Sequence, residues 1–115
     1  MFERRPLIAG NWKMNLSIKE SIALIQGIAE GISDLEGVDV LVAPPFTSLA
    51  AVRQAIGEAK IFLAGQNMYH EMSGPYTGEV SGRMLQEAGC THVIVGHSER
   101  RSLFHETDQD IDLKL

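Results

Sequence analysis

Four short apolar runs constrain the fold of this chain more than any other feature. They cover residues 6–10, 38–43, 61–65 and 93–96. Each is rich in Val, Ile or Leu, too short for a buried helix, and closed by Gly, Pro or a polar residue. They do not alternate between polar and apolar positions, which is typical of parallel strands buried on both faces. The runs therefore predict four strands of a parallel sheet.

Helical patterns lie between these runs. One apolar stripe has spacings of four, three, four and three residues, which predicts a helix over 17–32; its members are Ile18, Ile22, Ile25, Ala29 and Ile32. Ser17 and Glu20 have the spacing of a capping box at its start. Further helices are expected over 47–56, over 80–88 and from about 107 onwards. A short helix is expected to open at Ser98, with that residue as its cap.

The order of the predicted elements is βαβαβαβα, which implies parallel strands with right-handed crossovers. The strands start near 6, 38, 61 and 92, about 32, 23 and 31 residues apart, and a (β/α)8 barrel of ~250 residues averages ~31 residues per unit. We therefore expect residues 1–115 to be one partial barrel of about four units, with the fourth helix truncated. A doubly wound open sheet is the rival, but its Gly-x-Gly-x-x-Gly fingerprint is absent after the first run.

Composition limits the partners and the compartment. The chain is 44% hydrophobic and 22% charged, with a formal net charge of −5, as in soluble globular proteins. Its basic residues form no stripe, so we expect no nucleic-acid partner, and no apolar run approaches the ~18 residues of a membrane span. The single cysteine, Cys90, excludes an internal disulfide and is expected to be a small buried apolar residue. We expect a cytoplasmic protein. We expect no metal or cofactor, since no His/Cys cluster is present.

Polar and charged groups follow the first and the fourth run. The first is followed by GNWKMN over 10–15, and the fourth ends in GHSERR over 96–101. Active sites of (β/α)8 barrels lie at the carboxyl ends of the strands. The two segments are therefore expected to meet at one rim of the sheet and to carry the chemistry.

These segments belong to a series of motifs that resembles the triosephosphate isomerase family. The motifs are GNWKMN over 10–15, VAPPFTSL over 42–49, AGQN over 64–67, YTGEVSG over 76–82 and VIVGHSERR over 93–101, all in the family's order. The resemblance covers essentially the whole chain. It implies a partial TIM barrel and the interconversion of dihydroxyacetone phosphate and glyceraldehyde 3-phosphate through an enediolate. It also implies a homodimer and no cofactor.

The same resemblance assigns residue roles. Asn11 and Lys13 are expected to bind the phosphorylated triose substrate, with Lys13 and His97 as catalytic residues and Glu99 beside the lysine. Tyr76 and Thr77 are expected at a dimer interface, within a long loop over 66–79. Two further implications are structural: Arg100 and Glu106 resemble an ion pair of the family, and His105 stands where the family commonly has glycine, with only local backbone consequences expected.

The family's general base and its phosphate-binding loops do not match any part of residues 1–115. The chain alone is therefore expected to be inactive and, because its sheet edges are open, marginally stable or oligomeric. Three interpretations follow. The favoured one is part of a longer isomerase. The others are a non-catalytic half-barrel that binds another chain, and a half-barrel that forms an active enzyme with a separate C-terminal chain.

Overall fold

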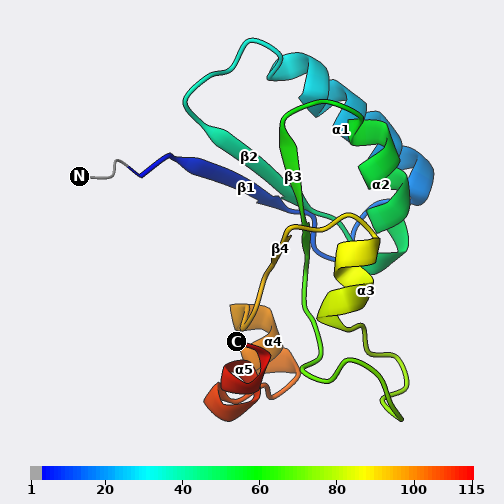
Figure 1. Ribbon diagram of the computed structural model, residues 1–115, viewed down its shortest axis with the longest axis vertical. Coiled ribbons are helices and arrows are strands. Elements are labelled where there is room, and N and C mark those ends of the chain that lie inside the picture. The colour runs from blue at the N-terminus through cyan, green and yellow to red at the C-terminus, as the bar shows by residue number, and fades with distance from the viewer. Residues whose placement is uncertain (1–3) are drawn as a thin grey trace.

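The computed structural model describes residues 4–115, and its four parallel strands form one sheet in chain order (Figure 1). The strands are β1 Leu7–Asn11, β2 Asp39–Ala43, β3 Ile61–Gly65 and β4 His92–Val93. The helices are α1 Ile18–Gly31, α2 Leu49–Ile56 after a 3-10 turn (Phe46–Ser48), α3 Gly82–Glu87, α4 Ser98–Leu103 and α5 Asp108–Lys114. The predicted α/β order is confirmed, and the sheet order β1-β2-β3-β4 is that of successive strands in a partial TIM barrel.

The first helix begins as its sequence predicts. The Ser17 hydroxyl accepts a hydrogen bond from the Glu20 N–H at 3.1 Å, and the Glu20 carboxylate accepts one from the Ser17 N–H at 3.0 Å. These reciprocal bonds satisfy two backbone donors that the first turn leaves unpaired. The bond from the Ser17 N–H also lowers the pKa of the Glu20 carboxyl. The capping box therefore fixes where α1 starts, seven residues after β1 ends.

The main apolar core lies between the sheet and helices α1, α2 and α3. Ile25 of α1, Val52 of α2 and Leu63 of β3 are completely buried in it. Gly65 lets α3 approach the end of β3, because a Cβ at this position would lie 2.7 Å from a methyl group of Leu85. Cys90 belongs to the same core, as predicted, and burial raises the pKa of its thiol. This core contains residues of β2 and β3 and the side chain of Trp12, which directly follows β1.

Two sequence expectations about the strands are wrong. The fourth strand was expected over 93–96, but β4 ends at Val93, because Gly65 is the last β3 residue and only the Ile94 N–H continues the pairing, donating to the Gly65 carbonyl at 2.8 Å. Burial on both faces holds for β2 but not for β1, where Leu7 is 49% and Ile8 62% exposed. The reason is that no residue of β1 belongs to either buried cluster, so no packed layer covers its side chains.

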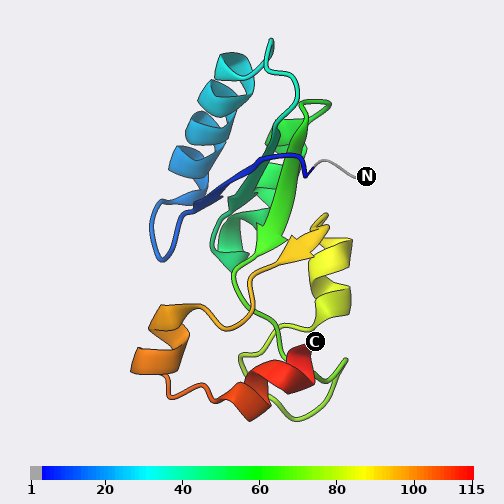
Figure 2. The same cartoon turned by 90° about the vertical axis from the view of Figure 1, so that its left-hand side faces the viewer.

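Helices α4 and α5 lie beyond the carboxyl end of β4, beside the loop that follows β3 (Figure 2). Neither helix contributes a buried residue. Among residues 4–115, none of the helices could span a membrane. The sheet and its helical layer thus form one region, and the polar segment over 94–115 forms another at the rim where the strands end.

Candidate active site

The loop after β1 places Lys13 at the rim in an uncommon backbone conformation. The Trp12 N–H continues the strand pairing by donating to the Ala43 carbonyl at 3.0 Å, and the Trp12 side chain is buried. The next residue, Lys13, has a φ of +55°, in the left-handed region that few non-glycine residues adopt. The side chain of Asn11, the last residue of β1, accepts a hydrogen bond from the Lys13 N–H at 2.9 Å.

The turn after β4 places His97 on the same rim. Gly96 has a φ of +72°, and a Cβ at this position would lie 2.8 Å from Ile111 of α5, so both the backbone and the packing require glycine. His97 then caps α4: its Nδ1 accepts a hydrogen bond from the Glu99 N–H at 3.0 Å. The expectation that Ser98 caps this helix is therefore wrong. The histidine ring reaches the backbone donor, and Ser98 is already the first helical residue.

The cap determines which histidine nitrogen can donate. Because Nδ1 accepts from a backbone N–H, a neutral His97 ring carries its proton on Nε2. The Glu99 Oε1 atom lies 3.5 Å from the same Nδ1, but it forms no ion pair while that nitrogen is unprotonated. In this tautomer the Nε2–H is available as a hydrogen-bond donor.

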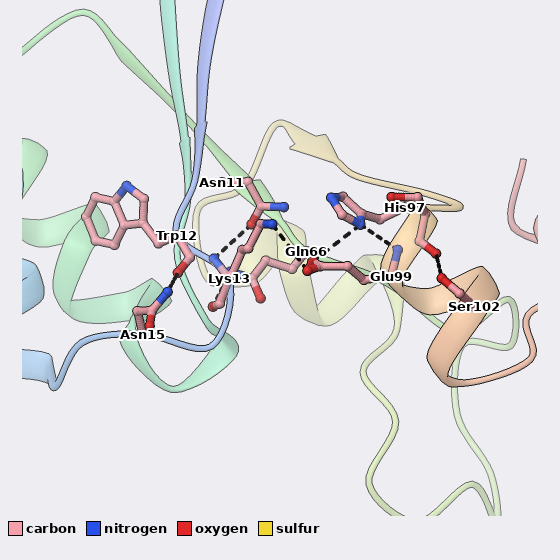
Figure 3. Close-up of polar contacts among 9 residues, drawn as sticks. Asn11, Trp12, Lys13, Asn15, Gln66, His97, Glu99 and Ser102 are labelled. Atoms are coloured by element: carbon pink, nitrogen blue, oxygen red, sulfur yellow. Dashed lines mark hydrogen bonds and ion pairs between the residues drawn. The ribbon is translucent and has the colours of Figure 1, made fainter.

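One ion pair joins the two strand ends. The Lys13 Nζ atom lies 3.2 Å from Glu99 Oε2, and the residues are 86 positions apart in the chain. Figure 3 shows the side chains of His97 and Glu99 extending from the start of α4 toward Asn11 and Lys13 on the β1 side. About half of each charged side chain is exposed, so the pair orients the lysine more than it stabilises the fold.

The side chains that follow β1 and β4 line a common cleft of about 610 Å³. Its polar lining includes Asn11, Lys13, Gln66, His97 and Glu99, and its apolar lining is Met14, Phe46, Leu103 and Phe104. The cleft has the size of a small-molecule site. It combines a cation, a neutral amide and an imidazole, which together can stabilise negative charge that develops on a bound oxygen.

The predicted interface residues lie outside this cleft. Thr77 is exposed, and Tyr76 is partly buried against Tyr69, with ring centroids 4.5 Å apart. The loop carrying them is closed at its base, where the Tyr69 N–H donates to the Val80 carbonyl at 2.8 Å. The loop is longer than the expected 66–79, since it runs from the end of β3 to Ser81, the cap of α3. The two ends of the loop are thus held together, and Thr77 lies exposed on it.

A buried polar cluster supports α4 and α5 next to the cleft. The expected Arg100–Glu106 ion pair is present, with Nε and Oε2 2.9 Å apart. No sequence pattern pointed to its other members. The almost fully buried Lys114 Nζ lies 2.9 Å from the same Glu106 oxygen and donates to Asn67 Oδ1 at 2.8 Å. Burial alone would raise the pKa of Glu106, but hydrogen bonds from Lys114 and Arg100 outweigh it, and the pKa is lowered.

Two more residues that the sequence did not single out hold the β1 loop. The Gln66 side chain donates to the Lys13 carbonyl at 2.8 Å, and the Asn15 side chain donates to the Trp12 carbonyl, also at 2.8 Å. Amide side chains in loops are common turn formers, so nothing in the sequence distinguished these two. Within residues 4–115, no three His, Cys, Asp or Glu side chains gather as metal ligands would.

The sheet is parallel, and a cleft lined by Lys, Asn and His side chains lies at the carboxyl ends of its strands. This is the arrangement of a (β/α)-barrel enzyme. The sequence model of the triosephosphate isomerase family matches residues 6–115, and the chain belongs to this family. It is 48% identical to the triosephosphate isomerase of Herpetosiphon aurantiacus and 50% identical to that of Syntrophotalea carbinolica, in matches that cover 96% and 97% of this chain but 44% of each relative.

A solved structure agrees with these comparisons. The crystal structure of triosephosphate isomerase from Bartonella henselae superposes with a TM-score of 0.90 at 45% identity. The match covers 96% of this chain and 46% of the crystal chain. The chain thus spans less than half the length of the relatives it matches, and its fold is the corresponding part of their barrel.

Proposed function

We propose that this chain supplies the electrophilic half of a triosephosphate isomerase site, in which dihydroxyacetone phosphate and glyceraldehyde 3-phosphate are interconverted. The observation that carries the proposal is the cleft itself. Asn11, Lys13 and His97 all line it, although they are far apart in the sequence. Family membership supports the substrate class. No cofactor is required, because the reaction only moves protons.

The chemistry follows from the charges in the cleft. The reaction transfers a proton between adjacent carbons through an enediolate, so negative charge develops on two neighbouring oxygens. Lys13 supplies a cation and Asn11 a neutral amide donor towards those oxygens, which is preorganised electrostatic stabilisation. His97 donates from Nε2, because its Nδ1 is occupied by the Glu99 N–H. A neutral imidazole can give up and regain that proton as the two oxygens exchange protonation.

The proposed reaction also needs a base for the substrate carbon and contacts for the phosphate. The family resemblance assigns both to parts of the barrel that do not match residues 1–115. We therefore propose that the chain works together with the remaining strands of the family's barrel and is inactive without them. Tyr76 and Thr77 are proposed to contact a second subunit of such a homodimer, since Thr77 is exposed on a loop whose base is closed by the Tyr69–Val80 hydrogen bond. A cytoplasmic location is proposed with it.

A chimaera tests the isomerase proposal. Residues 6–115 of this chain replace the matching segment of the Herpetosiphon aurantiacus relative, and triose phosphate interconversion is assayed by a coupled enzyme reaction. We expect an active protein, with kcat/KM lowered about 10³-fold by Lys13→Met, because one charge-stabilising group is lost. The matched control is Lys19→Met, which removes an exposed lysine of α1. A folded chimaera without activity, or equal rates for both variants, would overturn the proposal.

A second candidate function is binding of another chain by a non-catalytic half-barrel. The exposed β1 edge, with Leu7 and Ile8 largely accessible, favours it. The 115-residue chain is mixed with the separately produced C-terminal segment of the same relative. Activity that appears on mixing supports the isomerase proposal in two pieces, whereas a stable complex without activity supports the binding function.

A further inference from the structure

The backbone of Lys13 is held at both of its peptide groups by side chains. Its N–H donates to the Asn11 side chain at 2.9 Å, and its carbonyl accepts from Gln66 Nε2 at 2.8 Å. A left-handed conformation at a lysine is strained and persists only when its surroundings enforce it. Asn11 is the residue two positions earlier, so its bond is local. Gln66 is the distant partner, 53 positions away in the chain.

The Gln66 amide connects Lys13 to the buried end of the sheet. Its Nε2 also donates to the Ala43 carbonyl at 2.8 Å, so both hydrogens of one amide group are used. Ala43 is the last residue of β2 and is fully buried, and Gln66 directly follows β3. The two strand ends therefore provide a rigid anchor for the loop that carries the lysine (Figure 3).

We propose that Gln66 is a positioning residue for Lys13. By bonding the Lys13 carbonyl to the sheet, it keeps this residue left-handed and directs Nζ towards Glu99 and the cleft. Loss of the two bonds allows φ of Lys13 to become negative, which turns its Cα–Cβ bond away from Glu99. The effect of Gln66 on catalysis rests on the proposed function, but the effect of Gln66 on the conformation of Lys13 does not.

The conformational part is tested on the 115-residue chain by NMR. The HN–Hα three-bond coupling and the Cα shift of Lys13 report its φ in the parent chain, in Gln66→Leu and in the control Gln54→Leu, which changes an exposed residue of α2. We expect the Lys13 signals of Gln66→Leu alone to move to values for negative or averaged φ. Unchanged Lys13 signals in Gln66→Leu would overturn the proposal.

A conservative variant separates positioning from a general structural role. In Gln66→Glu, a carboxylate faces two carbonyl oxygens at neutral pH and releases Lys13, whereas the protonated carboxyl can donate to one of them. We expect the parent-like Lys13 signals to return on acidification in Gln66→Glu but not in Gln66→Leu. If Gln66→Leu does not fold, this titration alone decides, and the absence of any recovery contradicts the proposal.

The catalytic part is tested in the chimaera described above. Gln66→Leu is expected to lower kcat/KM about 10- to 100-fold, the cost of misplacing a catalytic group by about 1 Å, while Gln54→Leu leaves it unchanged. If Lys13→Met impairs the enzyme and Gln66→Leu stays within about twofold of Gln54→Leu, the positioning proposal fails and the isomerase proposal stands. If the chimaera is inactive, the isomerase proposal fails, and the NMR result decides the role of Gln66.

Discussion

The layer of β1–β3 with α1 and α2 and the segment over 94–115 are held together by different forces. The first region buries Ile25, Val52 and Leu63 completely. In the second, Leu103 and Phe104 are about two-thirds exposed, and the buried side chains are the charged Glu106 and Lys114. The cleft joins the two regions. Its Asn11 and Lys13 side therefore rests on apolar packing, and its His97 and Glu99 side depends on ion pairs.

The largest effect is expected for a change in the apolar layer. Leu63→Ala should lower the free energy of unfolding by about 4 kcal/mol, because it removes a buried side chain and leaves a cavity. Urea unfolding followed by circular dichroism measures it. Leu103→Ala is the matched control in the other region and should cost less than about 1 kcal/mol, since that leucine is 67% exposed. Equal costs would remove the distinction between the two regions.

The next effect concerns the buried charges of the second region. Lys114→Met should lower the free energy of unfolding by about 3 kcal/mol, because it removes one of the two cations that pair with the buried Glu106 carboxylate. The loss should be local. Hydrogen exchange is expected to show faster exchange of amides over 94–115 while those of β2 and β3 remain protected. Lys19→Met is the control, and a uniform loss of protection across the chain would contradict the comparison.

A smaller effect is expected from acidification. The pKa of Glu106 is lowered from its ordinary value of 4.5 in the folded chain, so the unfolded state binds the proton first as pH falls. The stabilisation by Glu106 is therefore complete above about 4.5 and is lost as pH falls below it through the folded pKa. Thermal unfolding measured from pH 7 downwards should show this slope, and Glu106→Gln should flatten it. An unchanged slope in that variant would assign the acid sensitivity to other carboxylates.

The smallest effect tests the backbone between α4 and α5. His105 has a φ of +56°, and glycine should relieve roughly 1–2 kcal/mol of strain, offset by about 0.5–1 kcal/mol from the freer unfolded chain. His105→Gly should therefore stabilise the chain by about 0.5 kcal/mol. Gln109→Gly, in the first turns of α5, should destabilise it by a similar amount. Destabilisation by His105→Gly would show that the imidazole makes a contribution that outweighs the strain.

The features that the sequence predicted well arise from residues close together in the chain. Periodicity located the strands and helices, and the Ser17–Glu20 spacing located the start of α1, because those signals arise within one or two turns of chain. The ends of β1 and β4 also converge as expected, since parallel strands share a carboxyl rim. The family roles assigned to Asn11, Lys13, His97, Glu99, Tyr76 and Thr77 stay predictions.

What the sequence did not predict depends on partners far along the chain or on backbone geometry. Lys114 looks like a solvated lysine in the last turn of a helix, and only the folded chain brings it to Asn67 and Glu106. Similarly, Gln66 gains its two carbonyl partners only when three strand ends meet. The left-handed Lys13 and the capping by His97 are conformational outcomes for which residue type gives a weak signal.

The sequential order of the strands has a consequence for how the chain is made. Because each strand pairs with the one synthesised before it, the sheet can grow as the chain leaves the ribosome, without waiting for a distant partner. The Lys13–Glu99 contact spans 86 positions, which correspond to roughly 4–17 s of translation at about 5–20 residues per second. During that interval the lysine loop can already be anchored by β2 and by Gln66. The cleft is thus completed from its Asn11 and Lys13 side to its His97 and Glu99 side, in the direction of synthesis.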